Sequence, residues 1–80
     1  MKAKELLNAL KFKEIASILS FLREKGIYIP SSVPILLFLE DKKDIIIAHI
    51  YIQGFPTKVL ITIDKEKEEV IVDWIELDRG

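Results

Sequence analysis

The feature that most constrains the fold of this chain is an apolar stretch near its middle, Ile45–Ile52. It contains no glycine or proline, and most of its side chains are β-branched or aromatic, the types that favour strands. A strand with one face in water alternates apolar and polar residues, whereas both alternating sets are apolar here. We therefore predict a central β-strand that is covered on both faces.

The N-terminal segment, residues 1–26, has the composition of a helix. It is rich in Leu, Ala, Lys and Glu, and Gly26 marks a helix end. The apolar positions change face near Lys11, which fits either two short helices or one long helix with two contact faces. Residues 9–13 contain no side chain that could cap a second helix. The pattern therefore favours one helix, longer than the sheet that it covers.

The rest of the chain is typical of an antiparallel sheet. Residues 27–34 contain two prolines and two serines, which indicates an extended connector. Residues 35–78 hold four apolar segments separated by charged or Gly/Pro-containing turns. Residues 33–43 fit a strand or a short helix, and we favour a strand because the charged turn after it resembles the one at residues 64–69. The predicted class is α+β: one long N-terminal helix on a four-stranded antiparallel meander (α-β-β-β-β), a single domain over residues 1–80.

Such a sheet has more apolar surface than one helix can cover. Both faces of the first two strands are apolar, and a soluble monomer rarely exposes an apolar patch above ~600 Å². We therefore expect the second sheet face and the overhanging end of the helix to lie in an oligomer interface, most simply a homodimer. Pairing the strands symmetrically about their turns assigns the following residues to that interface: Leu6, Leu7, Leu10, Ile46, Ile50, Ile52, Leu60, Ile71 and Ile75.

Composition indicates the environment of the protein. The chain has 14 Ile, 10 Lys and 8 Glu but one Asn and one Gln, a bias typical of thermophiles, and it has no cysteine. No segment resembles a signal peptide or a membrane-spanning helix. We therefore expect a cytoplasmic protein of a thermophile, with a melting temperature well above about 50 °C.

No motif in the sequence identifies a reaction. His49 is the single histidine, and its apolar neighbours favour a packed structural role. The carboxylate-x-Lys triplet Glu40-Asp41-Lys42 occurs in metal-dependent nucleases, but its place in a hairpin turn favours a solvated role. The three glycines are isolated, so no phosphate-binding loop is formed. We expect no catalytic residue, no metal site and no cofactor.

The prediction is therefore a small non-enzymatic protein-interaction module that forms an obligate homodimer. The alternative is a nucleic-acid-binding regulator that uses a basic N-terminal helix, since residues 1–25 carry a net charge of +3 and the remainder −4. Its candidate contacts are Lys2, Lys4, Lys11 and Lys13. The net charge of −1 and the scattering of these lysines around the helix favour the first interpretation.

Overall fold

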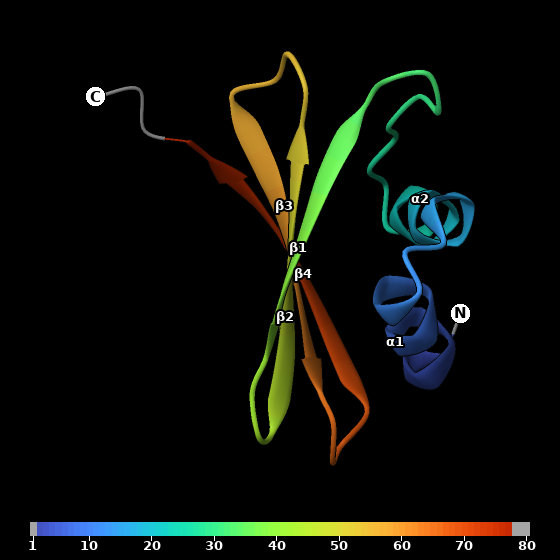
Figure 1. Ribbon diagram of the computed structural model, residues 1–80, viewed down its shortest axis with the longest axis vertical. Helices are drawn as coiled ribbons and strands as arrows, with labels where there is room; N and C mark the ends of the chain where they lie inside the picture. Colours follow the sequence, from blue (N-terminus) through green and yellow to red (C-terminus); the bar gives the residue numbers. More distant parts are fainter. Residues whose placement is uncertain (1, 78–80) are drawn as a thin grey trace.

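Two short helices lie on one face of a four-stranded sheet in the computed structural model, which describes residues 2–77 (Figure 1). In chain order the elements are α1 (Ala3–Lys11), α2 (Ile15–Glu24), β1 (Ile35–Asp41), β2 (Ile45–Ile52), β3 (Thr57–Asp64) and β4 (Glu69–Glu76). The strands pair antiparallel in this order. The α+β class and the meander are confirmed, and residues 35–41 form a strand. Residue 78, the last of the predicted sheet, lies outside the described residues.

The prediction of one long helix is wrong, because the chain turns sharply after α1. Lys13 has a left-handed backbone with φ of 53°, and the Glu14 N–H donates to the Ala9 carbonyl over 2.8 Å. These are the features of a Schellman motif, in which glycine is the usual left-handed residue. Helix α2 then begins after Glu14 without a side-chain cap. The expected overhang of a long helix is therefore not formed.

Replacing Lys13 with Gly should stabilise the protein. A non-glycine residue in the left-handed region costs about 1 kcal/mol, and glycine removes most of this cost. We expect the Lys13→Gly variant to have a free energy of unfolding higher by about 0.5–1 kcal/mol in urea titration. Lys13→Ala, which keeps the strain, is the control and should show no gain. A lower stability for Lys13→Gly would contradict the assigned backbone conformation.

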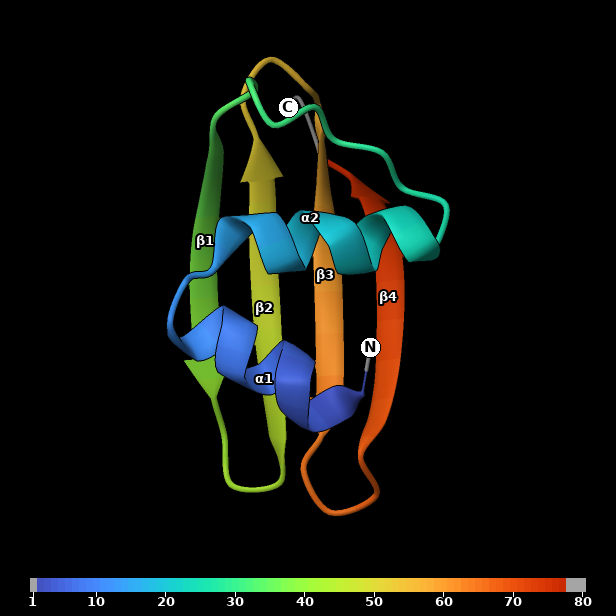
Figure 2. The same cartoon turned by 90° about the vertical axis from the view of Figure 1, so that its right-hand side faces the viewer.

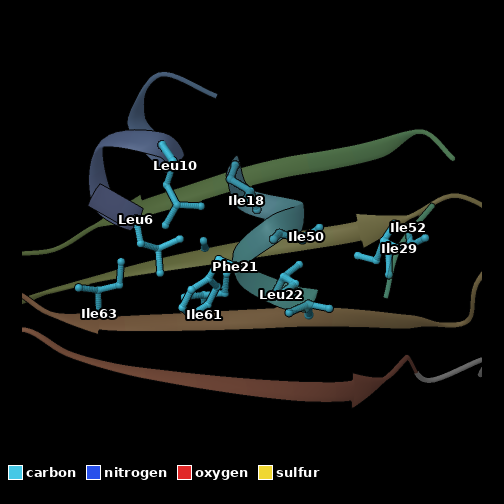
Figure 3. Close-up of a cluster of buried hydrophobic side chains, with 13 residues drawn as sticks. Leu6, Leu10, Ile18, Phe21, Leu22, Ile29, Ile50, Ile52, Ile61 and Ile63 are labelled. Carbon is cyan, nitrogen blue, oxygen red and sulfur yellow. The ribbon is translucent and has the colours of Figure 1, made fainter. Parts of the chain in front are cut away.

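The two helices run across the strands in opposite directions and form one layer (Figure 2). Each helix buries one apolar stripe against the sheet, and β2 and β3 supply most of the opposing side chains (Figure 3). The buried helical residues are Leu6, Ala9 and Leu10 of α1 and Ile18, Phe21 and Leu22 of α2. The predicted end of the helical region is confirmed: Gly26 has φ of 86° and the Ile27 N–H donates to the Leu22 carbonyl over 2.9 Å. Neither helix in the described part of the chain is long and apolar enough to cross a membrane.

The register between β2 and β3 differs by one residue from the predicted symmetric pairing. Ile50 lies opposite Val59, not beside Leu60 on the same face, since the turn between the strands occupies four residues, 53–56. A shift of one residue moves every side chain of a strand to the other face. The helix-covered face therefore combines the even-numbered residues of β2 with the odd-numbered residues of β3, and all of these are buried.

Candidate interaction surface

The face of the sheet opposite the helices, here called the open face, is covered by no other element in residues 2–77 (Figure 1). Its side chains alternate with those of the core along each strand, because successive side chains of a strand point to opposite faces. Three large apolar side chains on it are mostly exposed: Leu36 at 66%, Phe38 at 58% and Ile71 at 56%. The open face is thus an apolar surface in contact with solvent.

The open face forms a regular grid of rows across the four strands. The first row holds Leu36, Tyr51, Lys58 and Ile75, and the second holds Phe38, His49, Leu60 and Asp73. The third holds Glu40, Ile47, Thr62 and Ile71, and the last holds Ile45, Asp64 and Glu69. Apolar residues and the Tyr51 ring fill most of the first three rows, while charged groups gather at the end that carries the hairpin tips.

Three polar side chains lie close together within this apolar grid: Glu40 of β1, His49 of β2 and Lys58 of β3. The Lys58 Nζ donates to the His49 Nδ1 over 3.2 Å, which leaves the proton of a neutral ring on Nε2. That Nε2 is buried 3.5 Å from the Glu40 Oε1, without forming a hydrogen bond. The Lys58 Nζ also lies 5.4 Å from the centre of the Tyr51 ring. His49 is therefore a packed member of the open face.

The structure separates the predicted interface residues into two groups. Leu6, Leu10, Ile46, Ile50 and Ile52 are buried in the core between the helices and the sheet, and Leu7 packs against that core. They are not exposed to a partner, because the two helices cover this face of the sheet. Leu60, Ile71 and Ile75 do lie on the open face.

The remaining apolar residues of the open face were missing from the predicted interface. They are Leu36, Phe38, Ile45, Ile47 and Tyr51. The sequence contains the signal for most of them, since the alternation within β1 and β2 groups Leu36 and Phe38 with Ile47 and Tyr51. What the sequence does not show is which face the helices cover.

The four candidate nucleic-acid lysines do not gather on one surface. Lys2 and Lys4 line a surface hollow of about 590 Å³ near the start of α1, and the Lys4 Nζ is 3.8 Å from Glu68. Lys11 lies at the other end of α1, close enough to Asp41 to act on its pKa, and Lys13 occupies the turn. Nucleic-acid binding stays a prediction, without support from a shared basic face.

The tips of the two hairpins are joined through Lys65. Its Nζ donates to the Asp41 Oδ1 and to the Lys42 carbonyl, each over 2.6 Å, and its backbone N–H donates to the Asp44 carbonyl over 3.0 Å. The hydrogen bond from Lys65 is the main reason that the pKa of Asp41 lies below the ordinary value. These contacts hold the β1–β2 and β3–β4 tips together at one end of the sheet.

Replacing Lys65 with Met should raise the pKa of Asp41 to the ordinary range. A lowered carboxyl pKa stabilises the fold above the unfolded-state value, and this contribution is lost as the pH falls through the folded-state value. We expect NMR titration of the Asp41 carboxyl carbon to show the shift in Lys65→Met and not in Lys67→Met, a neighbouring control. An unchanged Asp41 pKa in the Lys65 variant would contradict the contact.

Nowhere in residues 2–77 do three or more His, Asp or Glu side chains group in a way that could hold a metal ion. Three hollows on the surface of the described residues are lined by charged, polar and apolar side chains. No protein-family model, curated protein or solved structure matches the chain.

Proposed function

We propose that this protein is a small non-enzymatic interaction module that forms a homodimer through its open face. The observation that carries the proposal is the exposure of Leu36, Phe38 and Ile71 on a sheet face that no helix covers. Antiparallel sheets tolerate water on one face when that face is polar, as in the usual alternation of apolar and polar residues. Here the face exposed to water is largely apolar, so burial against a partner would stabilise it.

The size of the open face suits a second copy of the chain. Four strands at ~4.8 Å spacing and about 25 Å of strand length give a projected area of roughly 500 Å². Because the accessible area of a side-chain surface exceeds its projection, this approaches the ~800 Å² per partner of a standard interface. A two-fold dimer needs one self-complementary patch, which a single apolar face can provide.

The test is the mass of the protein in solution, with and without a charge on the open face. We expect light scattering at micromolar concentration to give the mass of a dimer for the natural chain. Phe38→Glu should raise the dissociation constant by at least about 30-fold, because the dimer would bury an unpaired carboxylate. Phe12→Glu is the matched control, since Phe12 is 75% exposed at the turn between the helices, away from the open face.

Three results would contradict the proposal. The first is a monomer for the natural chain at these concentrations. The second is a dimer that persists unchanged in Phe38→Glu, which would place the interface elsewhere. The third is an equal loss of dimer in Phe12→Glu, which would assign the interface to the helix side. Circular dichroism of each variant separates loss of association from loss of folding.

A further inference from the structure

Lys58 and Asp73 are opposite charges on the open face, and neither has an ion-pair partner within residues 2–77. Lys58 contacts the neutral acceptor His49 Nδ1 and the Tyr51 ring. Asp73 lies opposite Leu60, on the strand next to Lys58 and one row away. Neither residue takes part in an ion pair with another residue of the described chain. A dimer that covers this part of the open face would therefore remove both of these charges from water.

Covering these charges is costly unless the second copy supplies the missing partners. Removing an isolated ion from water costs several kcal/mol, and a paired geometry is needed to offset that cost. In a two-fold interface, a contact from one residue to another is always made twice with the roles exchanged. One lysine and one aspartate on the same face can therefore satisfy each other in both directions.

The grid of the open face determines which two-fold axis achieves this pairing. Ile75, Leu60 and Ile47 form a diagonal across three strands, and Lys58 and Asp73 lie on opposite sides of it. On an idealised flat sheet, with ~4.8 Å between strands and ~6.8 Å between alternate residues, rotation about this diagonal brings Lys58 within about 3 Å of Asp73 in projection. The two sheets would then cross at about 70°, close to the orthogonal class of sheet packing.

The same rotation also matches the apolar groups of the face. Leu60 and Ile75 lie on the axis and meet their own counterparts. Phe38 comes within about 3 Å in projection of Ile71 of the second copy, by the same idealised spacing. Phe38 and Ile71 are both more than half exposed in the single chain. The rotation thus buries apolar side chains against each other as well as pairing the charges.

We infer that two copies of this chain join by their open faces about a two-fold axis along Ile47, Leu60 and Ile75, so that Lys58 of each copy pairs with Asp73 of the other. This inference rests on the proposed function and assigns the orientation of the dimer. Lys58 and Asp73 are then the residues that select this orientation, because an orientation that covers both charges without joining them leaves them buried and unpaired.

The test is rescue between two charge-reversed chains. Lys58→Glu and Asp73→Lys should each weaken self-association by at least about 100-fold, because each creates two like-charge contacts across the axis. An equimolar mixture of the two variants should dimerise again, since both contacts then join opposite charges. Native mass spectrometry separates the mixed dimer when one variant is isotopically labelled. A pair of reversals at exposed turn residues outside the face, Lys43→Glu and Glu66→Lys, should leave association unchanged.

The outcomes separate this inference from the proposed function. A monomeric natural chain overturns both. A natural dimer that is lost in Phe38→Glu but unaffected by Lys58→Glu retains the face and overturns the orientation. Weakening in both single variants without rescue in the mixture also overturns the pairing, because a purely intrachain effect of the two residues cannot be repaired by another molecule.

Discussion

Replacing Ile50 with Lys should lower the free energy of unfolding by about 4 kcal/mol or more, whereas replacing Ile47 with Lys should leave the chain folded. Ile50 is fully buried under the helices, between Leu37 and Val59 on the neighbouring strands. A lysine there would bury an unpaired charge and displace packed apolar side chains. An 80-residue chain is expected to have a total stability of only about 4–12 kcal/mol, so the substitution should remove a third or more of it.

Ile47 is the matched control because it lies on the same strand as Ile50 and its side chain points to the opposite face of the sheet. It is half-buried on the open face, where a lysine can extend its charge into water in the single chain. The Ile47→Lys variant should therefore give a native circular dichroism spectrum and dispersed amide signals, with loss of the dimer only. A stable Ile50→Lys with an unfolded Ile47→Lys would show that the helices cover the other face.

These two residues also show how far the sequence alone determines the fold. The apolar character of both faces of β2 follows from its composition, and so does the need to cover both. Which β3 residues share a face with Ile50 depends on the register between β2 and β3, and that register changes with one residue in the turn at Gln53–Pro56. The Gly-Phe-Pro sequence predicts a turn there, but it does not determine whether four or five residues form it. The predicted interface combined Ile50 with Leu60, and the observed register places these two residues on opposite faces of the sheet.

The division of the helical region was missed for a related reason. The sequence signals for helix ends are residues that stabilise the end conformation. These are a glycine in the left-handed position at the C-terminal end and a capping side chain at the N-terminal end. Here Lys13 adopts the left-handed conformation and Glu14 precedes α2 without a side-chain cap. The change of apolar face near Lys11 is the sequence signal for the break between the helices. Two helices are formed because both then bury their apolar sides on the same face of the sheet.

The sequence predicts that one face of the sheet is an exposed apolar surface, but it assigns only some of the residues on that face. Leu60, Ile71 and Ile75 follow from the alternation in β3 and β4, and they share one face of the sheet as the symmetric pairing expects. The pairing of Lys58 with His49 depends on the β2–β3 register and could not be derived. To predict a polar group that spans three strands, the register of each strand pair must be known. To predict that a face is apolar, the alternation within each strand is enough.

The second large effect concerns the attachment of the helix layer, and Leu22→Ala measures it. Leu22 is fully buried at the C-terminal end of α2, and its carbonyl also accepts the hydrogen bond from Ile27 that ends the helix. Truncation of a buried leucine removes its transfer free energy and leaves a cavity, at a cost of about 2–5 kcal/mol. We expect the midpoint of urea unfolding to fall accordingly, with little change in the slope of the transition.

Leu36→Ala makes the same chemical change on the open face and is the control. Leu36 is 66% exposed, so its truncation should alter the stability of the single chain by less than about 0.5 kcal/mol. Because dimerisation couples to unfolding, both variants should be compared at two protein concentrations, where a contribution from association changes with concentration and the cavity cost of Leu22→Ala does not. Equal losses of stability in the two variants at both concentrations would mean that Leu22 is no more buried than Leu36, and the helices would then not cover this face of the sheet.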